Sequence, residues 1–275
     1  HVMILIDDPE RTVIEPLSQK RSDFAPLYDF DLMNRSGHVK GWIVRTDAAQ
    51  NAMKALDKLG SKTVFNKKYG FKSRKPLVFA VGDGNHSLAT AKTCWNEIKK
   101  TLTPEEAAVH PARYALVEVV NLHDDSLKFE PIHRVVFGAD ATKMTVALAG
   151  FFKDISIAPK PPKDIAGRQV FVMLSNGNKQ YVSVTDEKSN LTVGSLQAFL
   201  DEYLKKETGT VDYIHGDEEV ERLCKNPENI GFLLPTPAKD ELFKTVVLDG
   251  ALPRKTFSMG HAQDKRFYLE GRKIR

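Results

Sequence analysis

The chain has 275 residues and a net charge of +4, and 41% of its residues are hydrophobic and 28% charged. This composition excludes a collagen-like, fibrous or wholly disordered protein. The longest apolar run, residues 77–81, is far shorter than the ~20 residues of a membrane-spanning helix, so we expect no membrane partner. Cys94 and Cys224 are too few for a disulfide framework, which favours a reducing, cytoplasmic location. Both cysteines fall in helical patterns and are interpreted as packing residues.

The charge is unevenly distributed along the chain. Residues 61–76 carry six basic side chains and no acid, and residues 252–275 have a net charge of +5, which leaves −7 on the remainder. Such basic segments are either solvated surface stretches or the frame of an anionic ligand, and the sequence leaves both interpretations open.

The chain begins with a strand pattern at residues 2–6. Asp8 and Pro9 follow as the expected cap and first residue of a helix. The sequence contains no signal-peptide pattern. Because the first residue is His1 rather than methionine, we expect the natural chain to extend N-terminally of His1.

Strand and helix patterns then alternate. Residues 28–33 and 39–45 flank a turn-like segment, which predicts a hairpin. Thr46 and Asp47 are placed to cap a helix. The basic residues 61–76 are interpreted as a loop.

A predicted buried strand at residues 77–81 leads into an amphipathic helix at residues 86–101. Apolar residues recur there at intervals of three and four, which is typical of a helix with one packed face. That face is expected to contain Leu88, Ala91, Trp95 and Ile98.

The second half continues with mixed elements. The patterns predict a strand at 113–121, a helix at 142–152, strands at 169–174 and 180–184, helices at 195–204 and 217–224, and a strand at 230–234. Asn176–Gly177 is typical of a two-residue hairpin turn. Hairpins exclude a purely parallel sheet, so the predicted fold class is α/β (α+β) with a mixed sheet and flanking helices. We predict two lobes, residues 1–137 and 138–275, with the basic C-terminal segment packing back.

The strongest functional motif is the predicted strand–turn–helix at residues 79–88. It contains Gly82, Asp83 and Gly84 directly before the helix. The N-terminus of a helix exposes unpaired N–H groups that suit a phosphate, and glycines allow the backbone to approach it. Here Asp83 is a candidate base or magnesium ligand, and His86 a candidate donor to a phosphate oxygen.

The motif has a plainer interpretation as well. It is neither a dinucleotide fingerprint, because Ser87 stands where a third glycine is required, nor a P-loop. The alternative is an ordinary turn in which Asn85 caps the helix. No metal-ligand motif, and no serine-hydrolase elbow, occurs in the sequence.

Two further segments are candidates for the same site. Residues 130–134 join Glu130 to His133 and Arg134, and arginine binds phosphate or carboxylate bidentately. An ordinary ion pair at a strand end is the alternative. Residues 252–260 mix apolar and basic residues and are expected to pack onto the body, which would bring Arg254 and Lys255 to an anionic site. A nucleic-acid interface is disfavoured, because stacking aromatic residues are few.

Together these motifs resemble a bacterial family catalogued as domain of unknown function 1015. The resemblance rests on residues 83–86, 131–134 and 252–258, with support from residues 7–10 and 212–216. It covers essentially the whole chain. The loop at residues 79–88 is also similar, more loosely, to the phosphate-binding loop of the ParB/sulfiredoxin-like superfamily, one branch of which phosphorylates free serine using ADP. That pattern has arginine where this chain has Ser87.

The resemblance implies a phosphate- or nucleotide-binding phosphotransferase for a small molecule, with ADP or ATP and Mg²⁺ as cofactors and a free amino acid such as serine as acceptor. A non-catalytic module that binds a nucleotide or phosphorylated metabolite is the alternative. The candidate catalytic residues are Asp83, His86 and Glu130. The candidate residues for binding phosphate or another small anionic ligand are Gly84, Asn85, Ser87, His133, Arg134, Arg254 and Lys255. We expect at least one of Arg134, Arg254 and Lys255 to reach the Gly84–Ser87 loop.

Overall fold

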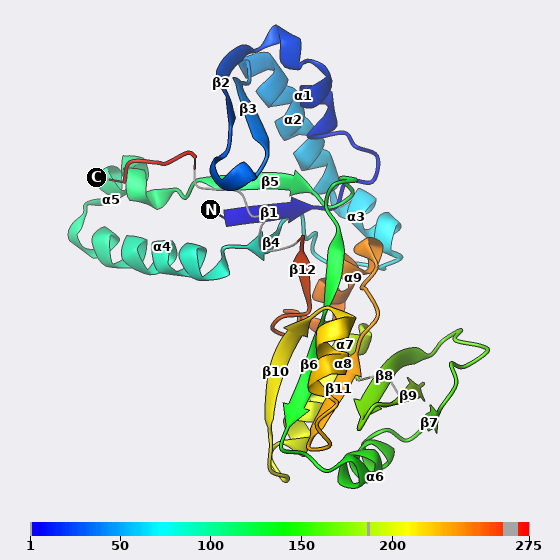
Figure 1. Cartoon of the computed structure of the whole chain (residues 1–275). Helices are drawn as coiled ribbons and strands as arrows, with labels where there is room; N and C mark the ends of the chain where they lie inside the picture. Colours follow the sequence, from blue (N-terminus) through cyan, green and yellow to red (C-terminus); the bar gives the residue numbers. More distant parts are fainter. Residues whose placement is uncertain (1, 186–187, 261–268, 275) are drawn as a thin grey trace. The chain divides into compact units, whose positions relative to one another are not determined.

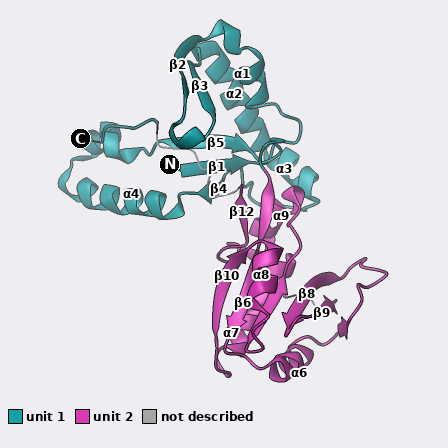
Figure 2. Cartoon of the chain, in the orientation of Figure 1, with its two compact units in different colours: residues 1–127, 261–275 teal, residues 128–260 magenta. Residues whose placement is uncertain are grey.

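The computed structural model describes residues 2–185, 188–260 and 269–274 (Figure 1). This part of the chain forms two compact units (Figure 2). Unit 1 contains the residues up to Leu127 together with the described residues 269–274, and unit 2 runs from Lys128 to Gly260. The sequence placed the boundary after residue 137. The division lies earlier because strand β6, Phe129–Phe137, belongs to the sheet of unit 2.

Unit 1 is built on a three-stranded sheet with the order β4-β1-β5. The central strand β1, Val2–Ile6, pairs in parallel with β5, Val117–Asn121, and antiparallel with β4, Ala80–Asp83. A continuous apolar run suits a central strand covered on both faces, and most of β1 is buried. The prediction of a mixed sheet with flanking helices is therefore confirmed.

The other elements of unit 1 flank this sheet or form a separate hairpin. They are α1 Glu15–Gln19, β2 Ala25–Asp31, β3 His38–Ile43, α2 Thr46–Leu59, α3 Lys62–Tyr69, α4 Asn85–Ile98 and α5 Pro104–Val109, with 3₁₀ turns at Arg21–Asp23, Met33–Arg35, Lys99–Thr101 and Pro111–Arg113. Strands β2 and β3 pair antiparallel, so the predicted hairpin is confirmed.

Two sequence predictions about helices in unit 1 are wrong. Asp8 does not cap a helix: its carboxylate accepts hydrogen bonds from the N–H groups of Thr12 and Val13, and this turn delays the first helix to Glu15. The basic residues 61–76 are not one loop either. They contain α3, whose buried Phe65 packs against two aromatic neighbours.

The strand before the glycine turn also differs from its prediction. It begins at Ala80 rather than at residue 77, and it lies at the edge of the sheet. Phe79 is 48% exposed and Val81 39%, so this is not a buried strand. The helix that follows runs as predicted, although its packing is looser: Trp95 is half-buried against His110, and Ala91 is exposed.

Unit 2 contains a seven-stranded sheet in which six strands follow the order β10-β6-β11-β8-β9-β7 and β12 pairs with β6. Its strands are β6 Phe129–Phe137, β7 Ile155–Ala158, β8 Gln169–Ser175, β9 Asn178–Val184, β10 Thr210–His215, β11 Asn229–Leu233 and β12 Phe257–Met259. Its helices are α6 Ala141–Phe151, α7 Thr192–Tyr203, α8 Asp217–Leu223 and α9 Lys239–Asp249. All described sheet pairs in this unit are antiparallel.

Alternation along β6 builds two hydrophobic clusters in unit 2. Val136 joins the larger cluster, formed with α6 and α7, and its neighbour Val135 joins a smaller one with α8. Successive residues of a strand face opposite sides of its sheet, so helices cover both faces. The β8–β9 hairpin turns at Asn176–Gly177, with φ of 47° and 74°, as the sequence predicted.

The described helices all fall short of the length or apolar character that crossing a membrane requires.

Candidate functional site

The predicted phosphate loop is a left-handed turn between β4 and α4. Gly84 has φ 84° and ψ 20°, a conformation that glycine adopts without steric cost, and it is the N-cap of α4. Its N–H is bonded to Asp83 Oδ1 at 2.7 Å, and its carbonyl accepts the first helical bond, from Leu88 N at 3.0 Å. Asn85 is already the first helical residue, so the alternative in which Asn85 caps the helix is wrong.

The first turn of α4 borders a cavity of about 960 Å³ within unit 1, although Asp83, Gly84 and Asn85 are not among its described lining residues. His86 and Ser87, in the first turn of α4, lie in its wall. The described wall consists of Val2, His86, Ser87, Leu88, Thr90, Ala91, Cys94, Ala112, Tyr114, Ala115, Leu116, Val117, Glu118, Glu270, Gly271, Arg272 and Ile274. The cavity thus follows α4 from His86 to Cys94, a length of ~12 Å at 1.5 Å per residue.

The wall combines an apolar surface with a few charged groups. Its described charged side chains are Glu118, Glu270 and Arg272. Sheet register explains the place of Glu118: Met3 on the central strand pairs with Asp83 on one side and with Glu118 on the other. Two carboxylates therefore lie level with Met3, on the strands that flank it.

Sequence reasoning missed several residues of this wall. Tyr114, Glu118 and Arg272 carry no local motif, and only the folding of the chain brings them to the cavity. Cys94 was expected to pack in the interior, whereas it is exposed and lines the cavity. Cys224 is buried as expected, and burial raises the pKa of its thiol to about 11.

A metal centre made of protein ligands alone is not evident. Among the described residues, no group of three or more histidine, cysteine or carboxylate side chains is placed to hold a metal ion.

The remaining predicted site residues belong to unit 2. Glu130 lies on β6 opposite Ser258 of β12. Residue His133 on the same strand is buried, with Nε2 at 2.8 Å from Asp217 Oδ1 and Nδ1 accepting the Leu234 N–H at 3.1 Å. These two bonds fix a neutral imidazole protonated at Nε2. Burial lowers the pKa of His133, although the Asp217 carboxylate acts in the opposite direction.

Arg134 is fully buried in unit 2. Its guanidinium donates to the carbonyls of Ile132, Arg254 and Lys255 and to Gln197 Oε1. It also lies over the Tyr213 ring, with Cζ 4.9 Å from the ring centroid. Burial lowers its pKa to about 10. Most of its donors are occupied by neutral acceptors, which is the environment of a structural arginine that holds residues 254–255 against β6.

The exposed residues Arg254 and Lys255 follow from this arrangement. Lys255 has φ 52° and places Nζ 5.2 Å from the Tyr213 ring centroid, on a ring that Arg134 also contacts. Arg254 lines a cavity of about 340 Å³ together with Gln197 and Asp201. The ring of Phe257 stacks on that of Phe129, with the ring centroids 4.2 Å apart, so the segment of residues 252–260 packs as predicted.

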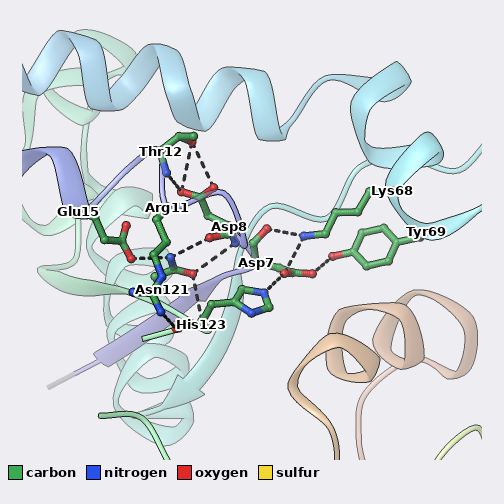
Figure 3. Close-up of polar contacts among 9 residues, drawn as sticks. All are labelled: Asp7, Asp8, Arg11, Thr12, Glu15, Lys68, Tyr69, Asn121 and His123. Atoms are coloured by element: carbon green, nitrogen blue, oxygen red, sulfur yellow. Dashed lines mark hydrogen bonds and ion pairs between the residues drawn. The ribbon is translucent and has the colours of Figure 1, made fainter. Parts of the chain in front are cut away.

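A second polar cluster of unit 1 surrounds Asp7, directly after β1 (Figure 3). Asp7 Oδ1 lies 2.7 Å from Lys68 Nζ and 2.6 Å from His123 Nε2, and Oδ2 accepts a hydrogen bond from the Tyr69 hydroxyl. The carboxylate is buried, and it joins β1 to α3 and to the segment after β5. Burial, followed by the Asp7 carboxylate, raises the pKa of Tyr69, so this phenol stays a neutral donor.

Asp8 and Asn121 extend the cluster. Asn121 Nδ2 donates to the Asp8 carbonyl at 2.9 Å and to Glu15 Oε1 at 2.8 Å. Its Oδ1 accepts the His123 N–H at 3.1 Å. The carboxylates of Asp7 and Asp8 are thus supplied with donors by the chain itself, and the cluster lies at the opposite end of β1 from the Asp83 turn. It is best interpreted as an anchor that ties three segments together.

Stability should report the anchoring role of Asp7. We expect Asp7→Asn to lower the free energy of unfolding by about 1–3 kcal/mol, because it leaves buried donors without a charged acceptor. The control Asp125→Asn affects an exposed pair with Arg11 and should cost less than about 1 kcal/mol. Urea unfolding followed by tryptophan fluorescence is suitable, since Trp42 and Trp95 both lie in unit 1. Equal losses in the two variants would contradict the anchor.

The neutral state of His133 predicts a pH dependence for unit 2. Its pKa in the native state is below the ordinary value of 6.5 that the unfolded chain retains. Its contribution to stability is therefore complete above pH 6.5 and is lost as the pH falls toward the native pKa. Protection of the Leu234 amide from hydrogen exchange should decrease over this range, and less so in His133→Gln. An unchanged pH dependence in His133→Gln would refute the assignment.

Comparison with solved structures gives matches of low identity. A conserved hypothetical protein from Pyrococcus furiosus shares 14% identity over 67% of this chain and 71% of its own, with a TM-score of 0.46. A mutant free serine kinase in complex with ADP shares 11% identity over 93% of this chain and 82% of its own, with a TM-score of 0.39. SbnI with a C-terminal truncation, from Staphylococcus aureus, shares 12% identity over 99% and 81%, with a TM-score of 0.46.

A search of curated proteins finds no match. The family comparison is more decisive. Residues 1–203 match the model of a family described as "Protein of unknown function (DUF1015)". This stretch covers well over half of the chain, including the Asp83–Ser87 turn and the strand with His133 and Arg134. The chain therefore belongs to the DUF1015 family, as its motifs predicted.

Proposed function

We propose that unit 1 binds a phosphorylated small molecule in the cavity beside α4 and transfers a phosphoryl group from it. The nucleotide candidates are ADP and ATP with magnesium, and the acceptor candidate is a free amino acid such as serine. One observation carries the proposal. The first turn of a 14-residue helix, with His86 and Ser87, lies in the wall of a cavity of about 960 Å³.

The physical basis is the unpaired N-terminus of α4. No side chain among the described residues caps this helix, so the N–H groups of its first turn are available to an anion. The helix dipole adds ~0.3–1 kcal/mol for an exposed anion. The cavity volume lies within the range of ~300–1,000 Å³ that small-molecule sites occupy, and its apolar residues suit the organic part of a nucleotide.

The charged groups suit phosphoryl transfer. In that reaction an acceptor oxygen forms a bond to phosphorus, the bond from phosphorus to the leaving nucleotide oxygen breaks, and a carboxylate takes the proton of the acceptor. Asp83 and Glu118, which flank Met3, are the candidate bases, and His86 is the candidate donor to a phosphate oxygen. Magnesium would arrive on the nucleotide phosphates and offset their charge, with Asp83 as the loop carboxylate to hold it or its water.

Residues of unit 2 enter this proposal differently. Glu130, Arg254 and Lys255 remain predicted contributors to catalysis or anion binding. His133 and Arg134 are assigned structural roles instead, because their polar atoms are engaged inside unit 2.

Ligand binding can be separated from helix capping at Ser87. An aspartate in the first turn stabilises a helix through its dipole but repels a bound phosphate. We therefore expect Ser87→Asp to weaken ADP binding by roughly tenfold or more without loss of thermal stability. The matched control Thr93→Asp makes the same charge change on α4 outside the described cavity wall and should leave affinity within about threefold. Isothermal titration calorimetry with ADP and magnesium measures both. Equal affinities in the two variants would refute the phosphate site.

Turnover separates an enzyme from a binding module. The full chain is incubated with ADP or ATP, magnesium and a panel of amino acids, and phosphorylated products are detected by ³¹P NMR. We expect a phosphorylated amino acid, and a rate at least about a hundredfold lower in Asp83→Asn or Glu118→Gln, whichever carboxylate is the base. Nucleotide binding without turnover on any acceptor would instead identify a non-catalytic module that reads a nucleotide or phosphorylated metabolite.

A further inference from the structure

A C-terminal segment completes the wall of the cavity in unit 1. Glu270, Gly271, Arg272 and Ile274 lie in this wall with His86 and Ser87, although they are far from them in the sequence. We propose that Arg272 is an anion-binding residue of this site. The other residues of the segment 269–274 hold Arg272 in place. The inference deepens the function proposed above and rests on it.

Two contacts within the described residues position the guanidinium of Arg272. Its Cζ lies 5.5 Å from the centroid of the Tyr114 ring, which also lines the cavity. Its Nε donates to the Pro111 carbonyl at 3.5 Å. Within the described chain, its Nη atoms form no hydrogen bond or ion pair. A guanidinium positioned by a ring, with Nη donors unoccupied, is prepared to bind a phosphate or carboxylate bidentately.

Charge in the wall identifies Arg272 as the cation for an anionic ligand. It is the one lysine or arginine among the described residues of the wall. Glu118 and Glu270 lie in the same wall, but each has partners of its own in the chain, and neither is paired with Arg272. One cation that is unpaired within the described residues, beside two carboxylates, favours a phosphate that carries a divalent cation over a bare polyanion.

The β2–β3 hairpin anchors this segment. The Tyr28 hydroxyl donates a hydrogen bond to Glu270 Oε1. Tyr28 pairs with Gly41 on β3, where a Cβ atom would lie 2.5 Å from the Tyr28 ring. Glycine at this position thus gives the ring the space from which it reaches Glu270, two residues before Arg272. Tyr28 is therefore a positioning residue for Arg272.

The proposal is tested with ADP and magnesium, and with pyrophosphate and magnesium, as titrants of the full chain. We expect Arg272→Gln to weaken binding of both by roughly tenfold to a hundredfold, because a charge-assisted contact is lost. Arg272→Lys should recover part of the loss, since it keeps the charge without the fork. The matched control is Lys273→Gln, which removes the same charge next to Arg272 at a residue outside the described wall.

Tyr28→Phe distinguishes positioning from a general structural effect. We expect it to weaken binding in the otherwise unchanged chain but to have no further effect when combined with Arg272→Gln, since it acts through that residue. Additive losses would overturn the role of Tyr28.

The outcomes separate the two proposals. If the chain binds the titrants and Arg272→Gln behaves like Lys273→Gln, Arg272 has no role in binding and the phosphate site stands. If the unmodified chain binds neither titrant, the phosphate site itself is refuted.

Discussion

The pairing of the short strand β1 with one antiparallel and one parallel neighbour is the constraint on which unit 1 depends. Antiparallel pairing with β4 directs the end of β4 to the beginning of β1, which is where the chain turns at Gly84 and starts α4. Parallel pairing with β5 places Glu118 opposite Met3, near the beginning of β1. It places Asn121 opposite Ile6, at the end of β1 that leads to Asp7 and Asp8. One strand therefore separates two polar regions: an open one with a cavity, and a closed one in which the chain itself supplies donors to the carboxylates of Asp7 and Asp8.

Local chemistry was predictable from the sequence where it was decided by neighbours in the chain. The turn at Asn176–Gly177, the helix that follows Gly84 and the apolar strand β1 all follow from residue type and spacing, and all are present. Predictions were wrong where distant residues compete for a local signal. Asp8 has the form of a helix cap, yet its neighbours Thr12 and Val13 use its carboxylate in a turn while Asn121 holds its backbone from another strand.

The candidate site was predictable only in part, for a related reason. The Gly84 turn is a local motif and was found, whereas Tyr114, Glu118 and Arg272 reach the cavity through sheet register and through the course of the C-terminal segment. Neither is encoded by spacing. The edge position of β4 was missed for the same reason. An apolar run has the same sequence pattern whether its strand has one neighbouring strand or two. The exposure of Phe79 and Val81 depends on that difference.

The hydrogen bonds that a side chain already makes also distinguish a structural residue from a ligand-binding one. Arg134 and Arg272 are both arginines that contact a tyrosine ring. Arg134 is buried and donates to three carbonyls and an amide, so an incoming anion would have to replace bonds that hold residues 254–255 to β6. Among the described residues, Arg272 has one long hydrogen bond, through Nε, and it lies beside a cavity. The cost of binding an anion is therefore much smaller at Arg272, and this difference, rather than membership of a motif, decides which arginine is suited to a ligand.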